Sequence, residues 1–197
     1  MTFPHELILA SGSPRRQLLL AEAGYKFRVV PPGEAAESAI APGENPRDFV
    51  ARAALEKAAD VARRVEHGIL VACDTVALCE GQILGKPCDE THARQMLETL
   101  SGREHRVLSG LCVWRLGHGR PRVEVAETTL AMDQLSPEQI ADYLASGLWR
   151  GKAGAFGYQD RLGWLTIKKG SPTNVVGLPM ELLAEMLAGG DARLRPS

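Results

Sequence analysis

A chain of 197 residues is long enough for a single domain with a sizeable core, or for two small lobes. Its 45% hydrophobic and 24% charged residues are ordinary proportions for a soluble globular protein. The formal net charge of −1 excludes a general attraction to nucleic acid or to an acidic membrane, so any anion must be bound by a local cluster of positive charge.

The apolar pattern predicts strands and helices in alternation. Strands are expected where β-favouring residues form short runs, at residues 6–10, 27–30, 69–78, 82–85, 106–115, 123–132 and 163–168. Helices are expected where apolar residues recur every three or four positions, at 14–23, 46–65, 89–100, 136–146 and 179–187. Ser13 and Ser136 are placed as helix caps, each followed by a proline. This order predicts the α/β or the α+β class with a mixed sheet. We expect one domain over residues 1–197 whose two lobes flank a cleft.

The N-terminal segment MTFPHELILASGSP carries no basic stretch before its short apolar run, so it does not read as a secretory signal. No apolar run is long enough to span a bilayer, and we expect a cytoplasmic protein. The four cysteines, Cys73, Cys79, Cys88 and Cys112, lack metal-binding spacing. In a reducing compartment they are expected to be free thiols packed as small apolar residues.

The segment SGSPRR, residues 11–16, lies between the first predicted strand and the first predicted helix. A helix N-terminus offers unpaired N–H groups and partial positive charge, and small residues let an anion approach the backbone. Arg15 and Arg16 add planar guanidinium groups suited to phosphate oxygens. The segment is therefore either a phosphate cradle or a plainly capped helix whose arginines lie in solvent.

Asp74 interrupts the apolar run of residues 69–78. A carboxylate in a central strand is costly unless it is paired, hydrogen-bonded or bound to a metal, so it marks either a site or a structural tie. Lys86 follows in a Gly-Lys-Pro turn and favours a site. Taken alone, Lys57 reads as a solvated helix lysine, and Glu34 and Glu37 read as ordinary loop glutamates.

The segment GKAGAFGYQ, residues 151–159, alternates small residues with a few functional ones, and such a loop lets a ligand approach the backbone. It matches neither the Walker loop nor the dinucleotide-binding pattern, and a tight turn explains it equally well.

Five motifs then occur in a familiar order: SGSPRR, DTV followed by LGKP, LSGREHRV, GKAGAFGYQ and NVVGLP. Over residues 7–187 the chain resembles the Maf family of nucleoside triphosphate pyrophosphatases. The resemblance implies the α/β fold of the inosine triphosphate pyrophosphatases, with an elongated mixed sheet and a deep cleft. It also implies cleavage between the α and β phosphates of a nucleotide with a divalent metal, Mg²⁺ or Mn²⁺. A homodimer is common in the family, and members are linked to inhibition of septum formation.

The resemblance also implies roles for individual residues. Asp74, Lys57 and Lys86 take the catalytic positions, with Asp74 as the proton acceptor. Asp74 and Glu37 take the metal-binding positions, with Glu34 as the second choice because the loop PPGEAAES has altered spacing. The substrate-binding positions fall on Ser11, Ser13, Arg15, Arg16, Thr75 and Gln159.

Arg15, Thr75 and Gln159 resemble the branch of the family that prefers dTTP and UTP, since the other branch, which prefers 7-methyl-GTP, carries tryptophan after the Ser-Pro pair. A glutamine offers both a donor and an acceptor to a pyrimidine edge. Asp160 departs from the glycine that commonly follows this glutamine, and Trp149 and Trp164 are close in sequence, so a modified base pocket stays open. A 7-methyl-GTP pyrophosphatase and a nucleotide-binding regulator of septum formation are the alternatives.

Overall fold

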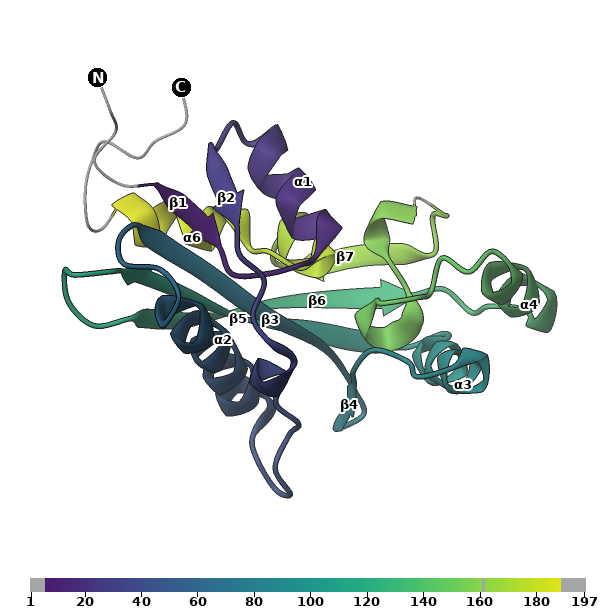
Figure 1. Cartoon of the computed structure of the whole chain (residues 1–197). Coiled ribbons are helices and arrows are strands. Elements are labelled where there is room, and N and C mark those ends of the chain that lie inside the picture. Colours follow the sequence, from purple (N-terminus) through teal and green to yellow (C-terminus); the bar gives the residue numbers. More distant parts are fainter. Residues whose placement is uncertain (1–5, 161, 189–197) are drawn as a thin grey trace. The chain divides into compact units, whose positions relative to one another are not determined.

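The computed structural model describes residues 6–160 and 162–188 (Figure 1), so the first five residues of the N-terminal segment considered above lie outside it. Its strands are β1 (Leu7–Leu9), β2 (Phe27–Val29), β3 (Ile69–Cys79), β4 (Gln82–Leu84), β5 (Glu104–Arg115), β6 (Arg122–Met132) and β7 (Leu165–Lys169). Its α-helices are α1 (Pro14–Glu22), α2 (Pro46–Ala62), α3 (Glu90–Leu100), α4 (Pro137–Ala145), α5 (Pro172–Val176) and α6 (Met180–Ala188). Three single-turn 3₁₀ helices are η1 (Glu34–Ala36), η2 (Ala153–Ala155) and η3 (Tyr158–Asp160).

The strands form one mixed sheet in the order β2-β1-β3-β5-β6-β7, with β4 paired to β3 off this path. β1 runs parallel to β2 and to β3, whereas β4 and β7 pair antiparallel to β3 and β6. The predicted α/β class with a mixed sheet is therefore confirmed. Every predicted strand and helix is present among the described residues. The main differences are that α2 ends three residues earlier than expected and that α5 and the three 3₁₀ helices were not predicted.

Helix starts follow local side-chain chemistry. Asn45 and Asp89 cap α2 and α3 by accepting a hydrogen bond from a first-turn amide. Ser136 forms a full capping box with Gln139 at the start of α4. Ser13 occupies the predicted cap position of α1, but its side chain makes no capping hydrogen bond. That difference matters for the site below.

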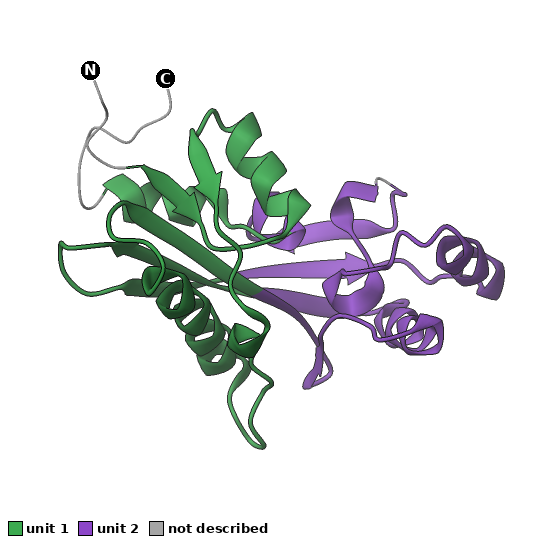
Figure 2. Ribbon diagram, in the orientation of Figure 1, with its two compact units in different colours: residues 1–74, 109–126, 177–197 green, residues 75–108, 127–176 purple. Residues whose placement is uncertain are grey.

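The described chain divides into two compact units, which Figure 2 colours separately. Unit 1 comprises residues 1–74, 109–126 and 177–197, and unit 2 comprises residues 75–108 and 127–176. Each is considered by itself here. The cleft flanked by two lobes stays a prediction.

Unit 1 has two hydrophobic clusters, because the side chains of β1 alternate between opposite faces of the sheet. Leu7 and Leu9 pack in one cluster with Leu183 and Leu187 of α6. Ile8 packs in the other, with residues of α2 and β3 that include Ala54, Ala58, Val61, Leu70 and Ala72. β1 is thus covered by α6 on one face and by α2 on the other.

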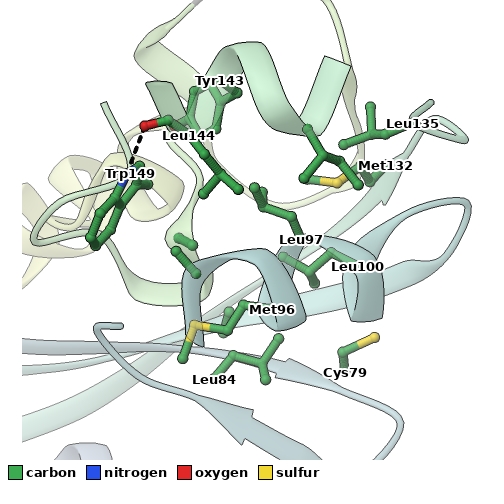
Figure 3. Packing of buried hydrophobic residues seen from close by; sticks show 14 of the residues in the cluster. Cys79, Leu84, Met96, Leu97, Leu100, Met132, Leu135, Tyr143, Leu144 and Trp149 are labelled. Carbon is green, nitrogen blue, oxygen red and sulfur yellow. Dashed lines mark hydrogen bonds between the residues drawn. The ribbon is translucent and has the colours of Figure 1, made fainter. Parts of the chain in front are cut away.

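Unit 2 is built around a single cluster that joins α3, α4 and the strands β4 and β6 (Figure 3). Leu97 and Leu100 of α3 are buried there, as is Leu144 of α4. Trp149, which lies after α4, is 5% exposed and donates its indole N–H to the carbonyl of Leu144 at 3.1 Å. Trp149 is therefore a core residue with a satisfied polar atom, rather than part of a ligand pocket.

His105 of β5 gives unit 2 a pH-sensitive core. The residue is 5% exposed, burial lowers its pKa below the ordinary value of 6.5, and its Nδ1 has no hydrogen-bond partner among the described residues. The unfolded chain therefore binds the proton more readily than the folded one. Stability is fully present above pH 6.5 and falls as the pH drops toward the folded pKa, by at most about 1.4 kcal/mol per pH unit.

His105→Gln is expected to flatten the fall in melting temperature between pH 6.5 and 5, measured by thermal denaturation. Glu44 and Asp60, whose pKa values hydrogen bonds lower to about 2, contribute only at more acidic pH. If the melting temperature falls with pH at the same slope in wild type and variant, a group other than His105 takes up the proton.

All four cysteines are free thiols, as predicted. Cys73, Cys79 and Cys112 are buried, and burial raises the pKa of Cys112 to about 12. The expectation of apolar packing is wrong for Cys88, which is exposed just before α3 with its Sγ 3.2 Å from Nδ1 of His92. Among the described residues, each helix is too short or too polar to cross a membrane.

Candidate active site

The segment after β1 turns sharply into α1, and Arg16 is held there by neighbours rather than extended into solvent. Its Nη1 donates to the hydroxyl of Ser11 at 3.0 Å, and its Nε donates to the carbonyl of Gly177 at 2.8 Å. Ser11 is buried and also accepts a hydrogen bond from the backbone N–H of Ser13 at 3.3 Å. Because Ser13 leaves the first turn of α1 without a side-chain cap, the start of α1 keeps the features of an anion site.

The carbonyl of Gly177 connects Arg16, at the start of α1, with β3. This carbonyl also lies 3.3 Å from the Sγ of Cys73, the residue before Asp74. One backbone oxygen therefore lies against both Arg16 and the strand position that precedes Asp74. Gly177 adopts a φ of 124°, a region that favours glycine. No site residue was predicted there, although the NVVGLP motif was the available signal.

Glu37, Lys57 and Asp74 come together in unit 1. Lys57 Nζ donates to Asp74 Oδ1 at 2.6 Å and lies 3.2 Å from Glu37 Oε2. The Lys57 side chain is 5% exposed, so the interpretation of this residue alone as a solvated helix lysine is wrong. The side chain extends from α2 to β3, and its charge compensates the carboxylate that interrupts this strand.

The loop that carries Glu37 is fastened to α2 on both sides of that residue. Asp60 accepts the backbone N–H of Gly33 at 2.9 Å, and Arg52 donates to the carbonyl of Ala39 at 3.1 Å. Arg52 also pairs with Glu44 at 2.7 Å, and Ser38 hydrogen-bonds Glu56. These contacts hold the loop so that Glu37 reaches Lys57. Glu34 and Glu37 are both exposed, and Glu34 lies in η1.

Arg52→Met is expected to loosen this loop, because it removes the contacts to Glu44 and Ala39 but keeps the apolar stem. Hydrogen exchange at the Glu37 amide, which bonds the Glu34 carbonyl at 3.0 Å, should accelerate about fivefold, the effect of roughly 1 kcal/mol. Arg122→Met is the matched control, since Arg122 pairs at the surface with Glu124 of β6 and with neither anchor of this loop. Equal exchange in both variants would show that Arg52 does not anchor the loop.

The donor chemistry of Glu37 and Asp74 fits a divalent cation of the Mg²⁺ type. Two carboxylates suit a hard cation, which usually takes one or two protein carboxylates and fills its remaining positions with water and phosphate oxygens. Among the described residues no group of three or more histidine, cysteine or carboxylate side chains is arranged to hold a metal by itself. A metal here would therefore need oxygens from elsewhere, such as a phosphate.

In unit 2, Thr75 directly follows Asp74 in β3 and is partly buried, and Lys86 is exposed just after β4. The carbonyl of Gly85 accepts the backbone N–H of Gly154 at 3.0 Å. The LGKP and GKAGAFGYQ motifs are therefore joined side by side, next to Lys86. Gln159 is partly buried in η3.

A buried ion pair in the same loop was missed from the sequence. Lys152 Nζ lies 2.5 Å from Oδ2 of Asp160, and the two side chains are 8% and 5% exposed. The Tyr143 hydroxyl donates to the same carboxylate oxygen at 2.6 Å. Asp160 was noted only as a departure from a glycine, which was the one available signal.

Comparison with solved structures identifies the class of fold. The chain is similar to a HAM1 protein from Coxiella burnetii, with a TM-score of 0.53 at 14% identity over 94% of this chain and 99% of that one. It is similar also to the Ham1 protein of Staphylococcus aureus, with a TM-score of 0.51 at 10% identity over 94% of this chain and 100% of that one. At such identities the likeness concerns the fold alone, and it confirms the predicted fold class.

The chain belongs to the Maf family, whose model, described as Maf-like protein, matches residues 6–189. A relative from Rhodopirellula baltica is 51% identical over 93% of this chain and 82% of its own length. One from Brucella abortus is 39% identical over 96% of this chain and 94% of its own. Both relatives are named dTTP/UTP pyrophosphatase.

Proposed function

We propose that this protein is a nucleotide pyrophosphatase that hydrolyses dTTP and UTP to the nucleoside monophosphate and pyrophosphate. The observation that carries the proposal is the Lys57 ammonium held between Glu37 and Asp74, in a chain whose relatives at 39–51% identity bear that activity as their name. A carboxylate pair organised by a buried lysine is suited to hydrolysis and to a metal cation.

Binding of the triphosphate is assigned to positively charged side chains. Arg15 and Arg16 at the start of α1 supply guanidinium groups, and Ser11 and Ser13 keep the turn small and polar. Lys86 supplies an exposed ammonium beside the GKAGAFGYQ loop. These charges stabilise the negative charge that builds on the phosphates as the anhydride bond breaks.

Asp74 is assigned as the general base. Its carboxylate accepts the proton of the attacking water as oxygen bonds to phosphorus, and the bond between the α and β phosphates breaks with pyrophosphate as the leaving group. Lys57 fixes the orientation of that carboxylate through the contact at 2.6 Å. Such a hydrolysis needs no covalent intermediate.

Asp74 and Glu37 would hold the divalent cation, Mg²⁺ or Mn²⁺. When bound, the cation supplies charge neutralisation at the phosphate oxygens. Glu37 is preferred to Glu34 because it is the glutamate that contacts Lys57.

Arg15, Thr75 and Gln159 are assigned to base selection. The glutamine amide can donate and accept at once, as the edge of thymine or uracil requires. The cytoplasmic location and a homodimer stay predictions alongside this assignment.

The proposal is tested by measuring pyrophosphate release from dTTP, UTP, dCTP, GTP and 7-methyl-GTP with Mg²⁺ or Mn²⁺. Release from dTTP and UTP ahead of the others supports it. Release confined to 7-methyl-GTP would move the chain to the other branch of the family. No release from any nucleotide would overturn the enzyme and favour a nucleotide-binding regulator.

A further inference from the structure

We propose that Lys152, Asp160 and Tyr143 form a positioning cluster that holds Gln159 for base selection, with Asp160 as a specificity-determining residue. The inference rests on the proposed function, because it concerns how that function chooses its base. The cluster lies wholly in unit 2 and uses none of the residues assigned to water activation or to the metal.

The ion pair fixes the single turn that carries Gln159. Lys152 donates to both carboxylate oxygens of Asp160 at 2.5 Å, and the backbone N–H of Asp160 donates to the Gly157 carbonyl at 3.0 Å. Gln159 therefore sits in a turn closed by one backbone hydrogen bond and tied at its last residue by a buried charge pair. Neither end of this turn can shift without breaking a contact.

The side chains of Gln159 and Lys152 both end close to Gly157. A β-carbon on Gly157 would lie 2.5 Å from Nε2 of Gln159 and 2.8 Å from Nζ of Lys152. Both polar groups thus lie close to the same backbone position, and a side chain at residue 157 would have to displace one or both of them. This shared position is why we expect the placement of the Gln159 amide to follow that of the Lys152 ammonium.

Aromatic packing fixes Tyr143, the third residue of the cluster. The Tyr143 ring lies 5.0 Å from that of Phe156 and 5.9 Å from that of Trp164, centroid to centroid, and Phe156 stacks on Trp164 at 5.5 Å. The Tyr143 hydroxyl that donates to Asp160 is therefore carried by a ring whose position is fixed by packing. A buried ion pair that is hydrogen-bonded by Tyr143 and braced in this way holds its neighbours within narrow limits.

The test compares Asp160→Asn with wild type, using kcat and KM for dTTP and dCTP. The amide keeps the shape but removes the charge that holds Lys152, so we expect the preference for dTTP, as a ratio of kcat/KM values, to fall about tenfold. The fall should appear mainly in KM for dTTP, with kcat nearly unchanged. Asp160→Glu, which keeps the carboxylate, should recover part of the preference, and Gly157→Ala should lower it as Asp160→Asn does.

Glu80→Gln is the matched control, because it makes the same chemical change in the exposed pair of Glu80 and Arg103 within unit 2. It should leave the preference unchanged. If Asp160→Asn does not fold, Tyr143→Phe removes one hydrogen bond from the cluster and should lower the preference about threefold. An unchanged preference in the folded variant would overturn the inference and leave the pair a purely structural one.

Calorimetric binding of dTTP and dCTP, without added metal, separates this inference from the proposed function. A wild type that binds dTTP more tightly but releases no pyrophosphate would overturn the enzyme, and the ratio of dissociation constants would then test the cluster. A wild type with equal affinity for both nucleotides would overturn the cluster's role in selection.

Discussion

Asp74→Asn is expected to lower kcat for dTTP by about a thousandfold, in the middle of the range that general-base catalysis contributes. The amide fills the same space but cannot accept the proton of an attacking water. KM should change by a few fold only, because the guanidinium groups assigned to the triphosphate are untouched. Initial rates of pyrophosphate release at saturating dTTP measure the effect.

Glu124→Gln controls for the loss of a carboxylate as such. Glu124 lies in the part of β6 that belongs to unit 1 and pairs with Arg122 at the surface. Its replacement should leave kcat within twofold of wild type. Full activity in folded Asp74→Asn would show that Asp74 is not the general base. The proposal that the wild type hydrolyses dTTP would be unaffected by that result.

Gly110→Ala is expected to destabilise the protein by about 3 kcal/mol, through steric overlap with backbone. A β-carbon at Gly110 would lie 1.9 Å from the carbonyl oxygen and 2.3 Å from the carbonyl carbon of Val50 in α2. Both are backbone atoms, so the new methyl group can be accommodated only if α2 moves away from β5. Chemical denaturation measures the loss.

Because Lys57 is on α2, the same displacement should lower activity even in the folded fraction of Gly110→Ala. Gly33→Ala is the matched control in unit 1, since its β-carbon would lie 3.8 Å from the nearest atom, an ordinary contact with Asp60. It should change the free energy of unfolding by less than about 0.5 kcal/mol. Equal stability of the two variants would show that α2 does not press on β5 as described.

Local patterns were sufficient for most of the fold. Proline at a first helical position, the cap at Ser136 and the apolar run of β3 each act within a few residues, and each predicted an element close to its observed bounds. The helix α5 was missed because Pro172–Val176 is a five-residue segment with β-branched residues, too short to show a helical period.

The site was harder to predict, because its contacts are long-range. Nothing in the sequence around Lys57 distinguishes it from a surface lysine, and its burial depends on Asp74, seventeen residues along the chain. The family resemblance selected Lys57, whereas the residues alone did not. The pair of Lys152 and Asp160 was missed for a different reason. The two residues are close in sequence, but a departure from a motif at Asp160 says nothing about the partner that compensates it.

The carbonyl of Gly177 makes contacts that can form only after residue 177 has been synthesised. It contacts Arg16, 161 positions earlier, and Cys73, 104 positions earlier, and β1 packs on the C-terminal helix α6. During translation the contacts of Arg16 and Cys73 with Gly177 therefore cannot form until residue 177 has left the ribosome. A chain truncated before Gly177 should retain nucleotide less well, and refolding should be limited by this late, distant closure.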